Sequence, residues 1–219
     1  MDINLIKKMP LFSSLSEDEQ VVLSEQFVMR RFPKNSVILN EGDDSSSLYV
    51  ILDGRVKVFL TDESGKEVIL NTQSAGEYFG EVSLFDDGPR SASVMTMEDS
   101  QFAVLKKQTF IQLITENPLL SLSIINGLTQ HLRALSENVR SLALMDVYGR
   151  VARLLMDMSV EQENGDRIID EALTYTDMAN HIGASSKMIS RIMQDLKKGG
   201  YIRKESKKII IERNLPPAW

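Results

Sequence analysis

Residues 76–92 carry the side chains that a cyclic phosphodiester on a sugar would need. They read Gly-Glu-Tyr-Phe-Gly-Glu-Val-Ser-Leu-Phe and then Asp-Asp-Gly-Pro-Arg-Ser-Ala. The planar guanidinium of Arg90 can hold two phosphate oxygens at once, and Ser91 and nearby backbone N–H groups can complete the cradle. Glu81 can accept a hydrogen bond from a ribose hydroxyl, and Gly80 lets the chain approach closely. The segment predicts an anion-binding site.

Each of these residues also has an ordinary structural interpretation. Arg90 can form a surface ion pair with Asp86 or Asp87. Glu81 can be a carboxylate at the start of a helix, and the glycines can mark turns. We favour the binding interpretation because all of these residues occur together within a region of strands.

A second group of charged residues lies near the C-terminus. Between Gly183 and Arg213, nine lysine and arginine residues accompany three acidic ones, so this stretch has a net charge of +6 in a chain whose total is −6. A basic patch on an acidic protein indicates a surface for nucleic acid, although a solvated lysine-rich tail would have the same charge.

The spacing within this basic stretch predicts a helix-turn-helix with a wing. A short helix over 174–182 ends at Gly183, and Ala184-Ser185-Ser186 caps a second helix over 187–198 with Ile189, Ile192 and Leu196 facing inward. Strands over 199–203 and 207–211 then enclose a basic wing, Lys204-Glu205-Ser206.

The first turns of the second helix expose four side chains that can reach DNA bases: Ser186, Lys187, Ser190 and Arg191. Arginine can bond O6 and N7 of guanine together, whereas serine is nearly indifferent to sequence. The remaining lysines would lie nearer the DNA backbone and give affinity without specificity, namely Lys197, Lys198, Lys204, Lys207 and Lys208.

The elements that must position these residues alternate in type along the chain. Residues 1–31 read as short helices, with Ser16 and Glu19 at the spacing of a capping box. From Phe32 to about Leu105, short apolar runs are broken by turn residues, which favours a small barrel or sandwich. The runs are 37–39, 48–52, 56–60 and 68–70. Asp53-Gly54 between two of them predicts a hairpin.

A long helix is expected next, starting at Asn117-Pro118. Apolar residues recur along it at alternating spacings of three and four: Ile125, Leu128, Leu132, Leu135, Val139 and Leu142. This narrow stripe is typical of a coiled-coil seam, and its simplest partner is the same helix of a second copy. An amphipathic helix lying on its own barrel would show a similar stripe, so both interpretations stay open.

Length and composition exclude several other functions. The 219 residues are enough for two modest domains, and the chain has no cysteine, so disulfides, thiolate zinc sites and iron–sulfur clusters are ruled out. No membrane-spanning run or secretory leader is evident, so we expect a cytoplasmic protein. His131 and His181 lie on different elements without carboxylate partners, which predicts no metal site, and no catalytic motif occurs.

The chain resembles a known family in both regions. Gly-Glu-x-Phe-Gly-Glu-x-x-Leu followed by Pro-Arg-Ser-Ala looks like the phosphate-binding cassette of cyclic-nucleotide-binding domains. From the barrel through residues 142–150 to the wing, the chain is similar to the cyclic-AMP receptor branch of the CRP/FNR transcription regulators. The resemblance implies a dimer joined through the central helix, with a nucleotide in each barrel. It implies ligand contacts at Gly80, Glu81, Val82, Arg90 and Ser91.

The chain departs from this family at two places. Where the cyclic-AMP receptor has a Thr-Ser pair that bonds adenine, this chain has Leu135-Ser136, so only Ser136 can still bond the base. The receptor's recognition helix has an Arg-Glu-x-x-x-Arg pattern, of which only Arg191 is kept here, and Lys187 stands in place of the glutamate. We therefore expect a different operator sequence.

These observations predict an α+β chain that is not an enzyme. A cyclic-nucleotide-binding, jelly-roll-like β-barrel spans residues 1–116, a dimerisation helix spans 117–145, and a winged helix-turn-helix spans 146–219. The expected function is a transcription regulator that binds a palindromic operator as a homodimer, contacts RNA polymerase and is controlled by cyclic AMP. The alternatives are control by another ligand such as cyclic di-GMP, no ligand at all, or a regulatory subunit that acts on a protein partner.

Overall fold

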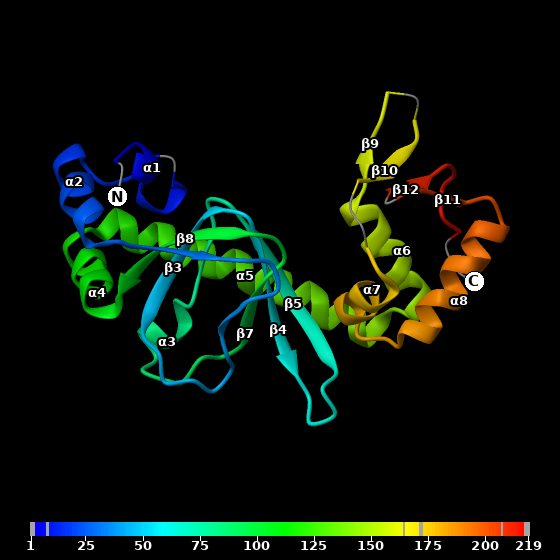
Figure 1. Ribbon diagram of the computed structural model, residues 1–219, viewed down its shortest axis with the longest axis horizontal. Coiled ribbons are helices and arrows are strands. Elements are labelled where there is room, and N and C mark those ends of the chain that lie inside the picture. Colours follow the sequence, from blue (N-terminus) through cyan, green and yellow to red (C-terminus); the bar gives the residue numbers. More distant parts are fainter. Residues whose placement is uncertain (1–2, 8, 164, 171–172, 207, 217–219) are drawn as a thin grey trace. The chain divides into compact units, whose positions relative to one another are not determined.

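The computed structural model describes residues 3–7, 9–163, 165–170, 173–206 and 208–216 (Figure 1). The chain forms two compact units. The first comprises the residues up to Leu60 together with Leu70–Ala134, and the second comprises Thr61–Ile69 and the residues from Leu135 onward. The expected α+β class is confirmed.

Short helices open the first unit, as the sequence predicts. They are α1 (Ile3–Lys7), the 3-10 helix η1 (Pro10–Phe12) and α2 (Glu17–Gln26). The capping box before α2 is confirmed, because Ser16 Oγ accepts from the backbone N–H of Glu19 and the Glu19 carboxylate accepts from that of Ser16. The first strand begins at Val28, earlier than expected, because Phe27 already has an extended backbone.

Two four-stranded antiparallel sheets follow. One has the order β1-β8-β3-β6 and the other β2-β7-β4-β5. The strand bounds are β1 (Val28–Phe32), β2 (Val37–Leu39), β3 (Ser47–Asp53), β4 (Arg55–Thr61), β5 (Glu67–Ser74), β6 (Tyr78–Phe79), β7 (Ser93–Thr96) and β8 (Ser100–Lys106). This arrangement is the expected jelly-roll-like β domain. The short helix α3 (Val82–Phe85) interrupts it.

The predicted hairpin at Asp53-Gly54 is wrong. The strands on either side, β3 and β4, belong to different sheets, so the turn carries the chain from one sheet to the other. Gly54 has a φ of +92°, and a Cβ at this position would lie 2.2 Å from Ser100 Oγ. Glycine is therefore required here by both backbone conformation and space, although no hairpin forms.

The space between the sheets is filled by apolar and aromatic side chains. Tyr49 stacks on Phe79 with ring centroids 5.1 Å apart, and Phe79 meets Phe102 edge-on at 5.6 Å. A second cluster of buried residues, which includes Phe12 and Leu48, packs the helices of this unit against its sheet. Figure 1 shows α1, α2 and α4 (Lys107–Glu116), the last of which the sequence did not predict, together at one end of the sheets.

The long helix α5 runs from Pro118 to Leu144. In the first unit it buries Leu120 and Ile124 against the core, and Leu128 is partly buried there. Its other apolar residues are exposed: Leu119, Leu122, Ile125, Leu132, Leu135, Val139, Leu142 and Leu144. The helix therefore has two apolar faces, and Leu128 is better assigned to the face on the protein's own core than to the predicted seam.

The second unit contains three helices and a small sheet. Its helices are α6 (Val147–Met158), α7 (Tyr175–Ile182) and α8 (Ser186–Lys198). Its strands pair in the order β11-β12-β10-β9, with β9 (Val160–Glu161), β10 (Arg167–Ile169), β11 (Ile202–Glu205) and β12 (Lys208–Ile211). In the described part of the chain, no helix is both long and apolar enough to cross a membrane.

Candidate functional site

Arg90 lies at the centre of a hydrogen-bond network beside α3. Only 3% of its surface is exposed. Its Nε donates to Ser45 Oγ at 2.7 Å, Nη1 donates to the carbonyl of Gly80 at 2.6 Å and to Ser83 Oγ at 2.9 Å, and Nη2 donates to the carbonyl of Ser47 at 2.8 Å. All four acceptors are neutral oxygens. Burial lowers the pKa of Arg90, and nearby Tyr49 and carboxylates act in the opposite direction.

Gly80 approaches the guanidinium closely. Its φ is +84°, and a Cβ at this position would lie 2.7 Å from Arg90 Nη1 and 2.9 Å from the carbonyl oxygen of Ser47. Both values are below the distance at which real Cβ atoms are found, so only glycine fits without displacing the network. The close approach that the sequence suggested is therefore toward Arg90.

Glu81 is the buried carboxylate of this site, with 5% of its surface exposed. It occupies the N-cap position of α3, so it is a carboxylate at a helix start, but its side chain makes no capping bond there. Its Oε1 lies 3.7 Å from Nδ1 of His131 on α5. The expectation that His131 lacks a carboxylate partner is wrong, because β6 and α3 bring Glu81 to α5 across fifty positions of sequence.

The structure separates the other predicted ligand residues from this buried network. Val82 and Ser91 are exposed, at the start of α3 and after Arg90 respectively. Ser136 lies on the exposed part of α5 that belongs to the second unit. Gly80, Glu81 and Arg90 are thus together, whereas Ser136 is on a different unit of the fold.

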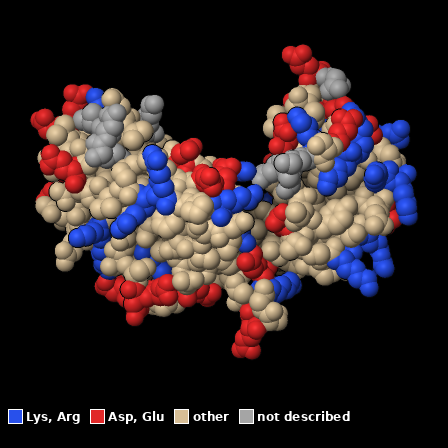
Figure 2. All heavy atoms as spheres, in the orientation of Figure 1, with Lys and Arg blue, Asp and Glu red and all other residues tan. Residues whose placement is uncertain are grey.

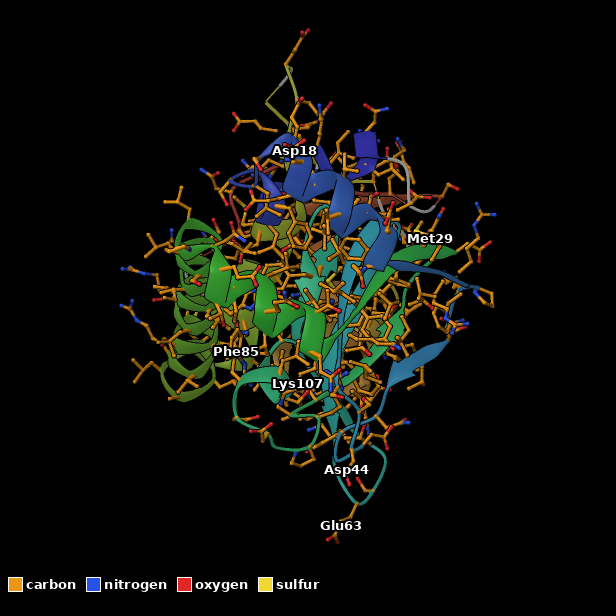
Figure 3. The ribbon with its side chains drawn as sticks, turned by 90° about the vertical axis from the view of Figure 1, so that its left-hand side faces the viewer. Asp18, Met29, Asp44, Glu63, Phe85 and Lys107 are labelled. Atoms are coloured by element: carbon orange, nitrogen blue, oxygen red, sulfur yellow. The ribbon has the colours of Figure 1, made fainter. Side chains whose placement is uncertain are left out.

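The predicted alternative for Arg90, a surface ion pair, is not what the structure shows. Asp87 pairs with Lys107 of α4, and Asp86 Oδ1 accepts from the backbone N–H of Gly88. In Figure 3, Phe85 lies near the start of α4, consistent with the edge-on contact of its ring with Phe110 at 5.8 Å. These contacts anchor the segment that carries Arg90 against α4.

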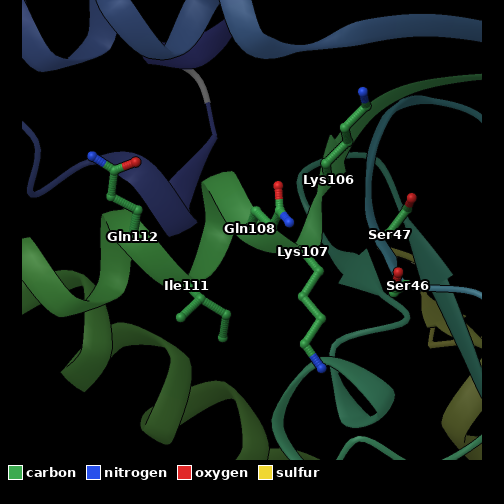
Figure 4. A pocket seen from close by; sticks show the side chains of 7 residues that line it. All are labelled: Ser46, Ser47, Lys106, Lys107, Gln108, Ile111 and Gln112. Atoms are coloured by element: carbon green, nitrogen blue, oxygen red, sulfur yellow. The ribbon is translucent and has the colours of Figure 1, made fainter.

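Sequence reasoning missed the serines that hold Arg90. Ser45 and Ser47 come from the chain entering β3, and Ser83 lies inside α3. The run of three serines at 45–47 was the available signal. Ser46 and Ser47 also line a cavity of about 760 Å³ with Lys106, Lys107, Gln108, Ile111 and Gln112 (Figure 4). None of the predicted ligand residues lines that cavity.

Capping residues define both ends of α7 and the start of α8 in the helix-turn-helix. Thr174 and Asp177 form a capping box at the start of α7. Gly183 ends α7 in the left-handed region with φ +66°, and Ser185 caps α8 by accepting from the N–H of Met188. The second helix therefore starts at Ser186, one residue earlier than predicted.

The inward face of α8 is formed by Ile189, Met193 and Leu196, which are buried. Ile192, predicted to be fully inward, is only partly buried at the edge of the same core. Among the predicted DNA contacts, Lys187 and Arg191 are exposed and Ser186 and Ser190 are half-buried. Lys187 and Arg191 belong to an exposed face of α8 that also includes Gln194 and Lys198, two residues that the sequence analysis did not assign to it.

Lysine and arginine side chains gather on the face of the second unit where α8 lies (Figure 2). The wing is less basic than predicted, because β11 extends to Glu205 and Arg203 forms ion pairs with Glu205 and Glu212. Lys208 pairs with Asp170 at 2.9 Å. Lys207 lies outside the described residues. Among the described residues, the basic side chains of α8 form no recorded ion pair, so the positive charge of α8 is less compensated than that of Arg203 and Lys208.

Comparison with known proteins identifies both regions. Residues 29–117 match the cyclic nucleotide-binding domain family, and residues 149–214 match the Crp-like helix-turn-helix domain family. The chain is 32% identical over 189 residues to the cAMP-activated global transcriptional regulator CRP of Haemophilus influenzae, covering 84% of this chain and 83% of the relative. It is 28% identical over 210 residues to a CRP-like cAMP-activated global transcriptional regulator of Mycobacterium tuberculosis, covering 94% of both chains.

The fold is also similar to solved structures. The c-di-GMP responsive global regulator CLP of Xanthomonas campestris superposes with a TM-score of 0.80 at 21% identity, covering 90% of this chain and 99% of that chain. A CooA mutant from Carboxydothermus hydrogenoformans gives a TM-score of 0.74 at 21% identity, covering 87% of this chain and 85% of that chain. At this identity these similarities show the shared fold.

Proposed function

The chain belongs to the CRP/FNR family of DNA-binding transcription regulators, which are not enzymes, and on that premise we propose that a cyclic nucleotide bound beside Arg90 controls its affinity for DNA. The alternative that this is a regulatory subunit acting on a protein partner is set aside, because the helix-turn-helix match makes DNA its partner. Membership of the family does not determine the effector, the residues that bind it or the assembly of the protein.

The observation that carries the proposal is the buried guanidinium of Arg90. A buried cation is costly unless an anion compensates it, yet every hydrogen bond that the structure describes for Arg90 goes to a neutral oxygen. A guanidinium has five N–H groups, so these four bonds leave one on Nη2 for a phosphate oxygen. A cyclic phosphodiester carries a negative charge and an oxygen that can accept this remaining N–H.

The neighbouring residues suit the rest of such a ligand. Glu81 provides a buried acceptor for a ribose hydroxyl, and the exposed Val82 and Ser91 directly follow Glu81 and Arg90 in the chain. Gly80 lets the chain lie close to the guanidinium, since a Cβ at this position would clash with Arg90 Nη1 and the carbonyl oxygen of Ser47. Together these five residues form the proposed ribose and phosphate site.

Cyclic AMP is the effector we propose, because the relatives of 28% and 32% identity are described as cAMP-activated. Ser136 is the proposed base contact, and Leu135 at the neighbouring position offers only apolar contact. Cyclic di-GMP is the second candidate, because the c-di-GMP responsive regulator CLP has the fold of this chain with a TM-score of 0.80. The guanidinium of Arg90 can bind a phosphate group of either ligand, so the affinities for the two ligands must be compared directly.

The DNA-binding half of the proposal rests on α8 and α5. Ser186, Lys187, Ser190 and Arg191 would read bases in the major groove. The exposed apolar face of α5 would pair with the same face of a second copy, because a stripe of exposed large apolar side chains is unfavourable in water; the stripe is formed by Ile125, Leu132, Leu135, Val139 and Leu142. Such a homodimer reads a palindrome whose half-sites lie about 34 Å apart. Location in the cytoplasm and contact with RNA polymerase follow from this proposed role.

Titration calorimetry with cyclic AMP, cyclic GMP and cyclic di-GMP tests the proposal. We expect tight binding of cyclic AMP by the wild type and at least a tenfold loss in Arg90→Lys, which keeps the charge but not the planar fork. Arg30→Gln alters an exposed arginine of β1 and serves as the control. DNA affinity measured with and without the nucleotide then tests coupling. Equal DNA affinity in both conditions would contradict control by the ligand.

A further inference from the structure

His131 and Glu81 form an ion pair at this site when His131 is protonated. Glu81 is 5% exposed, and its Oε1 lies 3.7 Å from His131 Nδ1. The His131 side chain is 29% exposed, so it is sheltered from solvent without being enclosed. Arg90 donates its described hydrogen bonds to neutral acceptors and interacts with Glu81 only through its charge, whereas His131, when protonated, lies within ion-pair distance of the Glu81 carboxylate.

The groups around His131 determine the direction in which its pKa shifts. Glu81 faces it from the segment before α3, and Glu77 acts on it from the segment before β6. The ring of Tyr78 on β6 lies 6.3 Å from its imidazole, and burial together with Glu81 raises the pKa of Tyr78 to about 12, so Tyr78 stays neutral. Arg90 also interacts with Glu81 through its charge. The nearby carboxylate of Glu81 raises the pKa of His131 against the opposing effect of its own burial.

We propose that His131 is a positioning residue for Glu81, holding that carboxylate aimed at the hydroxyl group of the effector, and that effector binding is linked to uptake of a proton by His131. This rests on the proposed function, since it concerns the same site. His131 reaches Glu81 from α5, which also carries the exposed apolar face. The proposed proton therefore binds to a side chain of the same helix through which the proposed dimer forms.

The direction of the linkage follows from charge. A cyclic mononucleotide brings one negative charge toward His131, which favours the imidazolium and raises the pKa of His131 further in the complex. Affinity is therefore highest below the pKa of His131 in the free protein and falls as the pH rises through its pKa in the complex. A ligand-induced rise of one unit in pKa corresponds to about a tenfold fall in affinity across that range.

Calorimetric titration with cyclic AMP between about pH 5.5 and pH 9, in two buffers of different ionisation enthalpy, measures both affinity and protons taken up. We expect about a tenfold loss of affinity with rising pH in the wild type. His131→Gln should bind weakly at every pH, and His131→Arg should keep the high affinity at every pH. The chain has only two histidines, so His181→Gln is the matched control and should retain the wild-type profile.

The outcomes separate this inference from the function on which it rests. Binding with the same pH profile in wild type and His131→Gln, or no rescue at high pH by His131→Arg, overturns the positioning role and leaves the proposed function standing. Failure of cyclic AMP, cyclic GMP and cyclic di-GMP to bind at any pH overturns both. A histidine NMR titration without ligand adds a direct readout: Glu81→Gln should lower the pKa of His131, and an unchanged pKa contradicts the pairing.

Discussion

Arg90 Nη1 donates to the carbonyl oxygen of Gly80 at 2.6 Å, and the space beside that bond is too small for a methyl group. The two residues are ten positions apart, and Gly80 precedes α3 while Arg90 follows it. The bond therefore closes the segment that carries Glu81 into a loop around α3. Any change that separates Gly80 from Arg90 should disturb the proposed phosphate site as a whole.

Replacement of Gly80 by alanine tests this relationship. We expect Gly80→Ala to lower the free energy of unfolding by about 2 to 4 kcal/mol, because it adds both a left-handed alanine and an overpacked contact with Arg90. Nucleotide affinity should fall at least tenfold. Thermal denaturation and calorimetry measure the two effects.

Gly65→Ala is the control for that experiment. Gly65 has a similar φ of +82°, but nothing lies within 4 Å of its Cβ position. This variant should therefore cost only the backbone term, about 1 kcal/mol, and leave nucleotide affinity unchanged. Equal losses of stability in the two variants would show that the close approach to Arg90 is unimportant.

The exposed face of α5 leads to a prediction about assembly. Leu132 and Val139 are seven positions apart on that face, and each is 65% exposed. Leu132→Glu and Val139→Glu place a charge in the middle of the proposed seam, so each should convert the dimer into a monomer in sedimentation experiments. Gln130→Glu, on an exposed part of the helix outside the stripe, should remain a dimer. A wild-type monomer would contradict the proposed assembly.

Local patterns in the sequence predicted the elements better than their pairing. The Ser16 and Glu19 capping box, the strand over 37–39 and the turn at Gly183 depend on nearby residues, and all are found in the structure. The hairpin at Gly54 failed because turn chemistry specifies a sharp reversal but not which strand becomes the neighbour. That choice depends on the partners of β3, which come from β6 and β8 much later in the chain.

The candidate site shows the same division. Gly80, Glu81 and Arg90 could be selected from residue types within a short segment. Ser45 and His131 could not, because they lie 45 and 50 positions from the residues they contact. The sequence reasoning treated His131 as isolated because only the packing of α5 against the barrel brings it to Glu81. Long-range packing thus brought the titratable side chain of His131 to the site.

The exposed face of α8 predicts two kinds of DNA contact. Arg191 lies in the first half of the helix with base-reading reach, and Lys198 is its last residue. Arg191→Ala should cost about 1 to 3 kcal/mol at the preferred operator and relax the choice of one base. Lys198→Ala should weaken binding to all sequences similarly and reduce the salt slope by about 1. Fluorescence anisotropy with operator and scrambled duplexes, at several salt concentrations, distinguishes them. A loss independent of sequence in Arg191→Ala would contradict base reading.

The contact between Tyr78 and Gly127 gives a prediction about stability. The Tyr78 hydroxyl is buried and has no hydrogen-bond partner among the described residues, and a Cβ on Gly127 would lie 2.2 Å from it. Tyr78→Phe should therefore raise the free energy of unfolding by about 1 kcal/mol, since an unsatisfied polar group is removed. Gly127→Ala alone should be destabilising despite the better helix propensity of alanine, because the ring must move.

The double variant decides whether that hydroxyl is the cause. In Tyr78→Phe combined with Gly127→Ala, the closest obstructing atom is gone, and the helix gains about 1 kcal/mol from alanine in place of glycine. The double variant should then be more stable than the sum of the two single changes predicts, by about 1 to 2 kcal/mol. Chemical denaturation of all four proteins gives this coupling free energy. Strict additivity would mean that the hydroxyl of Tyr78 does not limit how closely α5 packs against β6.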